Sequence, residues 1–302
     1  MTGGLRTPAA YLLGLFAAAI LAIAAFHKAA DPGLFVDQIT AHKVTPAAWS
    51  PAIAYFFVAA ELLIAAAFVA FIWPRLVFAG TILMMLGFIG VTAWAWAHGN
   101  AETCGCFGRL VDRGPQEVII EDSVVIVTSL LGLYLARGFR TRRRQWALAI
   151  PLMAVALALT IFGAAMPVDG IVVGIGPGHD LSDMALQGVR IPLDEGWILL
   201  AIIGPDCPKC DQGVASLKQV VTRKMGPKVV AAYPGTSGEA QAWRMKHLPS
   251  FPVASSPERI LRQYYRQVPA TFMMEDGIVR KVWWNEIPTP EQVAEALSSN
   301  SG

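Results

Sequence analysis

The four cysteines of this chain fall into two close pairs. Cys104 and Cys106 are separated by one glycine, and Cys207 and Cys210 are separated by a proline and a lysine. Closely paired cysteines are typical of redox chemistry or of metal sites, because a thiolate is both a nucleophile and a metal ligand. Four cysteines are too few for a scaffold held together by disulfides. We therefore interpret the pairs as two redox-active disulfides that form a two-step electron relay.

The second pair has the local context of a redox site. A buried-strand pattern at residues 197–203 precedes it, and Pro208 opens a predicted helix. Unpaired N–H groups and the helix dipole favour a thiolate at a helix N-terminus, so Cys207 is the expected nucleophile. Cys210, one turn further on, is the expected resolving cysteine. A structural disulfide and half of a zinc site are the alternatives, and zinc is disfavoured because this region has no second cysteine pair.

The first pair belongs to the sequence Cys104-Gly105-Cys106 and can close only a small, strained disulfide ring. Strain makes a disulfide easier to reduce and a better oxidant. Gly105 can adopt the backbone dihedrals that such a ring requires. The alternative is a site for copper(I), zinc or mercury, but a lone C-x-C supplies only two of the ligands that most such sites need. We therefore assign no metal site.

Apolar segments dominate the first half of the sequence. Of the 302 residues, 55% are hydrophobic and only 15% are charged, whereas about a quarter are charged in a typical soluble domain. A membrane-spanning helix needs about 20 mostly apolar residues. The first such segment could instead be a cleaved signal peptide, although it is longer than a usual signal core. The sequence predicts five spans, at residues 7–26, 47–74, 76–97, 118–136 and 147–167.

Positive charges set the expected orientation of these spans. Arg137, Arg140 and residues 142–144 lie between the fourth and fifth spans, and Arg75 lies between the second and third. Lys and Arg accumulate in short cytoplasmic loops, so both loops and the N-terminus are predicted to be cytoplasmic. Both dithiols then lie on the extracytoplasmic, periplasmic side of a bacterial inner membrane, where disulfides persist. The net charge of +2 gives no indication of a nucleic-acid partner.

The sequence changes character after residue 168. Asp276-Gly277 is a typical hairpin turn between the last two of four strand patterns. The strand patterns cover residues 197–203, 228–233, 270–274 and 278–284, and helical stretches follow Pro208, Ser237, Pro257 and Pro290. This order predicts an α/β fold with a mixed sheet. We expect a four-helix transmembrane domain at 1–140, a fifth span or linker at 141–168, and an extracytoplasmic domain at 169–302.

The C-terminal domain resembles the thioredoxin fold, in particular the membrane-tethered branch that includes TlpA and MauD. The resemblance rests on the strand at 197–203, on Cys207-Pro208-Lys209-Cys210 and on Val268-Pro269-Ala270-Thr271-Phe272. It implies that Pro269 is a cis-proline packed against the dithiol, and that the backbone of Val268 pairs with a substrate strand. It also implies that the partners are extracytoplasmic protein thiols and disulfides. The tryptophan that usually precedes the first cysteine is absent, which leaves the preferred direction of electron flow open.

The first four spans, over residues 8–136, resemble the MauE family within the wider DoxX-like group. The resemblance rests on His27-Lys28 with Asp31-Pro32, on Glu61, on Cys104-Gly105-Cys106-Phe107-Gly108 and on Asp122. It implies a four-helix membrane bundle that works with a thioredoxin-like protein in the maturation of a disulfide-rich subunit. The fold class expected for the chain is thus a membrane α-helical bundle, with a fifth tethering span, followed by an α/β thioredoxin-fold domain. Bacterial vitamin K epoxide reductase homologues have a similar architecture, but their C-x-x-C near a quinone has no counterpart in these spans.

Two acidic residues within the spans are candidate catalytic residues. Glu61 lies near the middle of its span, where a carboxylate is costly and often functional. It could serve a proton relay to a quinone, or it could pair with Lys28. Asp122 lies near the cysteine side of its span and could accept a thiol proton or be a helix-start charge favoured by the dipole. Trp94, Trp96 and Phe107 could line a quinone pocket, although tryptophan is common as an interfacial anchor.

The sequence therefore predicts a membrane thiol–disulfide oxidoreductase. Substrate thiols would exchange with the Cys207/Cys210 pair and that pair with Cys104/Cys106, and electrons would pass on to a quinone in the membrane lipid. No quinone-binding residue is assigned. One rival is a reductive carrier of the DsbD or CcdA kind, which needs a dithiol reachable from the cytoplasm, where this chain has no predicted cysteine. The other rival is a metal-binding transporter or metallochaperone that uses the C-x-C pair as ligands.

Overall fold

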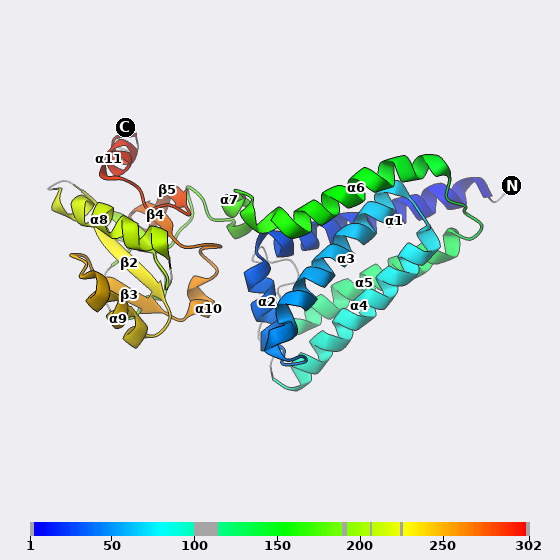
Figure 1. Ribbon diagram of the computed structural model, residues 1–302, viewed down its shortest axis with the longest axis horizontal. Coiled ribbons are helices and arrows are strands. Elements are labelled where there is room, and N and C mark those ends of the chain that lie inside the picture. The colour runs from blue at the N-terminus through cyan, green and yellow to red at the C-terminus, as the bar shows by residue number, and fades with distance from the viewer. Residues whose placement is uncertain (1–2, 100–113, 189–191, 206, 224–225, 300–302) are drawn as a thin grey trace. The chain divides into compact units, whose positions relative to one another are not determined.

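The structure is a computed structural model and is shown in Figure 1. It describes residues 3–99, 114–188, 192–205, 207–223 and 226–299. The predicted dithiol of Cys104 and Cys106 lies outside the described residues. The chain divides between Val168 and Asp169 into two compact units, a helical one and an α/β one.

Five helices in the described part of the chain are long and apolar enough to cross a membrane, as predicted. They are α1 (Gly3–Ala30), α3 (Ser50–Ala70), α4 (Pro74–Ala97), α5 (Pro115–Leu135) and α6 (Arg143–Phe162). The short helix α2 (Pro32–Ala41) was not expected. Its start is fixed by Asp31, whose Oδ1 accepts a hydrogen bond from the Leu34 N–H at 3.2 Å, and by Pro32 in the first turn.

Small residues allow the membrane-length helices to pack closely. Gly132 of α5 lies against the ring of Phe78 of α4, and no room remains there for a side chain. Gly163, just after α6, lies so close to Ala29 of α1 that an added Cβ would come within 2.6 Å of the Ala29 carbonyl oxygen. Glycine and alanine serve this purpose in membrane bundles because they let backbones approach.

The fifth span, α6, is a packed member of the helical unit as well as the connection to the second unit. Its buried Ala149 and Ala156 lie in apolar clusters with Ala67 and Leu62 of α3. From the sequence we predicted that this span is only a tether. The length of a span does not reveal which faces of the helices pack together, so the packing of α6 was missed. Among its described residues, the helical unit thus packs all five membrane-length helices into its apolar clusters.

The second unit contains a five-stranded mixed sheet in the order β3-β2-β1-β4-β5. Its strands are β1 (Trp197–Ile202), β2 (Lys228–Pro234), β3 (Val253–Ser256), β4 (Ala270–Glu275) and β5 (Ile278–Trp284). The first three are parallel, and β4 runs antiparallel to both β1 and β5. The predicted hairpin joins β4 to β5, with Asp276 and Gly277 both at positive φ. The sequence analysis missed strand β3, because a strand of four residues is too short to show a clear alternating pattern.

Alternate residues of β1 enter two separate cores. Ile198, Leu200 and Ile202 are fully buried on one face of the sheet, and Leu199 and Ala201 are fully buried on the other. A strand that is apolar on both faces is typical of a sheet covered on both sides. The continuous apolar run at 197–203 in the sequence thus reflects this central position in the sheet.

Helices cover both faces of this sheet. The face of Leu199 is covered by α8 (Pro208–Thr222), α9 (Ser237–His247) and α11 (Pro290–Ser299). The face of Leu200 is covered by α10 (Glu258–Leu261) and by the chain around Leu181 and Met184. This layered mixed sheet, with the C-x-x-C motif between β1 and α8, is the predicted thioredoxin fold.

A buried ion pair joins the start of the second unit to the loop before β4. Asp169 is the first residue of α7 (Asp169–Val173). Arg266 donates from Nε and Nη2 to the two carboxylate oxygens of Asp169, at 2.9 and 3.0 Å. This bidentate geometry is specific and strong for a guanidinium and a carboxylate. Because Arg266 stands three residues before Pro269, the pair anchors the segment that carries the predicted cis-proline.

We expect Arg266→Met to destabilise the second unit, because the buried Asp169 carboxylate loses its partner. Breaking a buried pair in this way typically costs about 3–5 kcal/mol. The double variant D169L/R266M removes both buried charges and should recover most of that loss. Hydrogen–deuterium exchange of the full-length protein, read in peptides from β1 and β4, measures the effect. Exchange in R266M at the wild-type rate would contradict this role of the pair.

Candidate functional site

The Cys207/Cys210 dithiol lies between the end of β1 and the start of α8. Cys207 is the N-cap residue of α8, and Pro208 is its first helical residue. The two sulfur atoms form a disulfide bond. The backbone N–H of Cys210 donates a hydrogen bond to Cys207 Sγ over 3.1 Å. The same contact would stabilise a Cys207 thiolate after reduction, because a free helix N–H group favours negative charge.

The two cysteines differ in burial. Cys207 is 6% exposed and Cys210 is fully buried, and both belong to the core cluster on the Leu199 face of the sheet. This difference favours attack at Cys207 and leaves Cys210 as the resolving group. Lys209 is held near the end of β5, where its ammonium donates to the Asn285 carbonyl oxygen at 3.1 Å.

The loop before β4 approaches the dithiol from the neighbouring strand. The Val268–Pro269 peptide bond is cis, as the resemblance to thioredoxin-fold proteins implies. The register of β1 and β4 pairs Ile202 with Ala270, which places Pro269 beside the end of β1. The side chain of Val268 packs against the cluster that contains both cysteines. The structure therefore brings together the two motifs on which the sequence prediction depended.

Gly204 is a residue of this site that the sequence analysis missed. A Cβ added at Gly204 would lie 2.9 Å from Val268 Cγ2, so a side chain there would push the loop away. The available signal was a glycine directly after a buried strand and three residues before Cys207, which marks a close approach of another backbone segment.

A second candidate site lies inside the helical unit. The Lys28 ammonium donates a hydrogen bond to Glu61 Oε1 at 2.5 Å, with side-chain exposures of 3% and 1%. The rings of Phe35 and Phe88 face the same ammonium, at 5.0 and 5.2 Å from their centroids. Aromatic faces attract a desolvated cation. The ion pair that the sequence offered as one explanation of Glu61 is therefore present.

This ion pair lines a cavity of about 310 Å³ that also contains Asp122 of α5. Glu61 Oε2 and Asp122 Oδ2 are buried and have no hydrogen-bond partner in the described part of the chain. Asp122 interacts electrostatically with both Lys28 and Glu61. The full lining comprises Ile20, Leu21, Ala24, Lys28, Glu61, Met85, Phe88, Ile120, Glu121, Asp122, Val124 and Val125. The structure thus joins the two acidic residues that the sequence singled out separately.

Trp94 and Trp96, which the sequence offered for a quinone pocket, do not line this cavity, and Phe107 lies outside the described residues. Trp94 is exposed and stacks on His98 with ring centroids 4.1 Å apart, and Trp96 is also exposed. Phe88 supplies the aromatic wall instead, and it was missed together with Glu121. Exposed tryptophan on a membrane-length helix is typical of an interfacial anchor.

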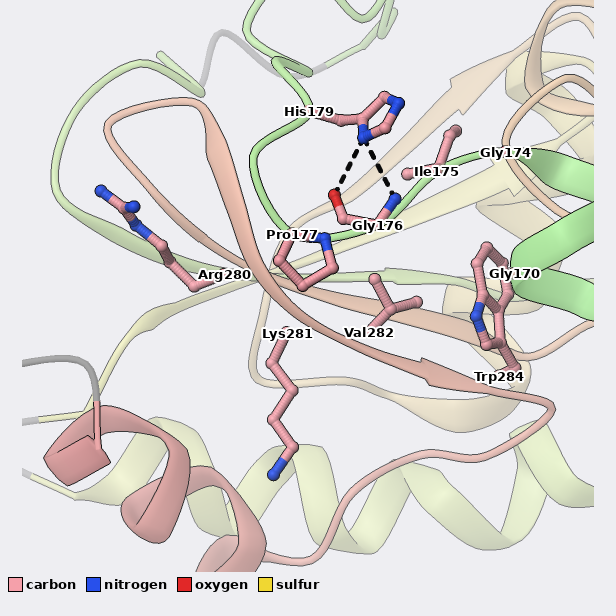
Figure 2. A pocket seen from close by; sticks show the side chains of 10 residues that line it. All are labelled: Gly170, Gly174, Ile175, Gly176, Pro177, His179, Arg280, Lys281, Val282 and Trp284. Carbon is pink, nitrogen blue, oxygen red and sulfur yellow. Dashed lines mark hydrogen bonds between the residues drawn. The ribbon is translucent and has the colours of Figure 1, made fainter.

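A larger hollow of about 450 Å³ lies in the second unit, between β5 and the glycine-rich chain at 170–179 (Figure 2). His179 closes one end, where its Nδ1 lies 3.2 Å from the Gly176 nitrogen and 3.1 Å from the Gly176 oxygen. Trp284 forms the wall beside Gly170. The residues lining this hollow include no cysteine and none of the predicted site residues, so it is not part of the candidate site.

The family model and the solved structures match different parts of the chain. Residues 6–135 match the family described as methylamine utilisation protein MauE. No curated protein matches the chain.

Solved structures match the other part of the chain. A protein assigned as a thiol:disulfide interchange protein DsbE, from Chlorobium tepidum, is 21% identical with a TM-score of 0.38, and the match covers 42% of this chain and 99% of that one. StoA from Bacillus subtilis is 16% identical with a TM-score of 0.32, covering 41% and 98%. A secreted disulfide oxidoreductase of Mycobacterium tuberculosis, homologous to E. coli DsbE, is 19% identical with a TM-score of 0.32, covering 41% and 94%.

We expect Lys28→Met to destabilise the helical unit by about 3–5 kcal/mol, because it leaves Glu61 buried without its cation. Asp122→Asn is the matched control in the same cavity. It should leave stability nearly unchanged or raise it, because the Asp122 Oδ2 atom has no partner among the described residues and its charge is costly to bury. Unfolding in detergent, followed by tryptophan fluorescence, measures both variants. Equal destabilisation by both changes would show that Asp122 is a structural residue.

Proposed function

We propose that the chain is a transmembrane oxidoreductase that forms disulfides in extracytoplasmic proteins, because residues 6–135 match the MauE family and a thioredoxin-fold domain follows them. The observation that carries this proposal is the Cys207/Cys210 dithiol at the start of α8, with the cis-proline loop beside it. A reactive thiol at a helix N-terminus and a buried second thiol form a site suited to disulfide exchange.

In the first step a substrate thiolate attacks Cys207 Sγ. The Cys207–Cys210 bond breaks, and Cys210 leaves as a thiolate that takes up a proton. A second substrate thiolate then attacks the substrate sulfur of the mixed disulfide and releases Cys207. Two substrate thiols are thereby oxidised to a disulfide and the dithiol is reduced. The Cys210 N–H stabilises the charge on the departing Cys207 thiolate.

The reduced dithiol is reoxidised by the Cys104–Cys106 disulfide. The Cys207 thiolate attacks one of these two sulfurs, and Cys210 then resolves the mixed disulfide, which leaves Cys104 and Cys106 reduced. A membrane quinone takes the two electrons and two protons from this pair and becomes a quinol. The arginine distribution of the loops supports a common extracytoplasmic location for both dithiols.

The oxidative direction is favoured over a reductive one by the cysteine count. A carrier that brings electrons outward from the cytoplasm needs a dithiol that a cytoplasmic donor can reach. The sequence has four cysteines in all, and none lies in the loops that the arginine distribution assigns to the cytoplasm. A quinone in the membrane needs no such dithiol.

A trapping experiment tests the relay. In the double variant C210S/C106S each pair keeps one cysteine, so a mixed disulfide between Cys207 and Cys104 cannot be resolved and should accumulate. Oxidised protein is digested without reduction, and the linked peptides are identified by mass. The variant C210S/C104S tests Cys106 in the same way, and C207S/C106S, which keeps the buried Cys210, is the control that should give little product. The relay is refuted if neither trapping variant yields a linked peptide while Cys207 still reacts with iodoacetamide.

A further inference from the structure

The cavity of the helical unit has a polar inner end and an apolar mouth. Lys28 and Glu61 form the inner end and are almost completely buried. Ile120 and Val124 of α5 line the same cavity, yet they are 63% and 48% exposed on the surface of the helical unit. Exposed apolar residues on a membrane-length helix are those that meet lipid. The cavity therefore opens toward the hydrocarbon of the bilayer.

The inner end offers hydrogen-bond acceptors that the described protein residues do not use. Glu61 Oε2 and Asp122 Oδ2 are buried and have no partner among those residues. A buried acceptor left without a donor costs roughly 1–3 kcal/mol. Two such atoms in one cavity can accept hydrogen bonds from a ligand that brings O–H or N–H donors. An ammonium beside them, from Lys28, can in turn donate to an oxygen of the same ligand.

The walls fit a flat, apolar ring system. Leu21, Met85, Phe88 and Val125 also line this cavity. Ligand pockets in proteins usually measure roughly 300–1,000 Å³, so a volume of about 310 Å³ suits a headgroup of one or two rings. The tail of a lipid-soluble ligand would leave between Ile120 and Val124.

We propose that this cavity binds the headgroup of a lipid-soluble quinol, with its hydroxyl groups on Glu61 Oε2 and Asp122 Oδ2. This assignment rests on the proposed function, in which electrons from the dithiols reduce a quinone to a quinol. The two hydroxyl groups of a quinol are the donors that the two carboxylate oxygens require, and its ring and tail match the walls and the mouth. An anionic phospholipid headgroup fits less well, because it would meet three acidic residues, Glu61, Glu121 and Asp122.

Photolabelling tests the site without any redox reaction. The full-length protein in lipid nanodiscs is irradiated with an azido-substituted benzoquinol that carries a ten-carbon tail, and labelled peptides are identified by mass. Labels are expected on lining residues of α1, α4 and α5. Two variants should reduce labelling about tenfold: Ala24→Leu, which fills the cavity, and Asp122→Asn, which removes one acceptor. Leu83→Ala changes an exposed residue of α4 that does not line the cavity, and it should label like wild type.

The proposal is overturned if the label lies outside the lining, or if both cavity variants label as strongly as wild type while retaining the wild-type unfolding temperature. It is also overturned if excess anionic phospholipid removes the label and excess unlabelled quinol does not. The trapping experiment separates this outcome from a failure of the proposed function. A trapped peptide link without cavity labelling refutes the site alone, and cavity labelling without a trapped link refutes the relay alone.

Discussion

A charge buried between membrane helices needs a partner, and the pair of Lys28 and Glu61 meets this requirement in the helical unit. Lys28 comes from the last turn of α1 and Glu61 from the middle of α3, so their contact fixes how these helices meet. Asp122 adds a second carboxylate beside the pair, although packing alone would favour an apolar residue there. Because Asp122 Oδ2 has no hydrogen-bond partner among the described residues, we propose that this cavity serves binding or proton transfer.

In the second unit, Cys207 keeps a small exposed fraction of 6%, while Cys210 is fully buried. This difference arises within one helical turn at the start of α8. Cys207 is the N-cap residue of the helix, and Cys210 lies on the side of the helix that faces the core. Neighbouring chain completes the site, since Gly204 leaves room for Val268 and the Asp169–Arg266 pair anchors the segment before it. In the proposed function, the second unit supplies thiol exchange and the helical unit supplies the cavity for the quinol.

The sequence predicted features that depend on local pattern or on the cost of burial. Apolar length predicted the five spans, C-x-x-C after a strand predicted the dithiol, and the isolated Glu61 pointed to Lys28. The sequence did not predict β3, which is too short to show a pattern, or the packing of α6, which depends on helix faces. The cavity was missed for the same reason: Phe88 and Asp122 meet only after four helices have packed.

One measurement tests the central claim most directly. Fully reduced protein is mixed with a soluble quinone without air, and the remaining thiols are counted by alkylation and mass. The account predicts that wild type loses all four thiols and that C207S/C210S loses the two of Cys104 and Cys106. It also predicts that C104S/C106S loses none. A relay that reaches the quinone through Cys104 and Cys106 would be contradicted if C104S/C106S lost thiols. It would also be contradicted if C207S/C210S lost no thiols.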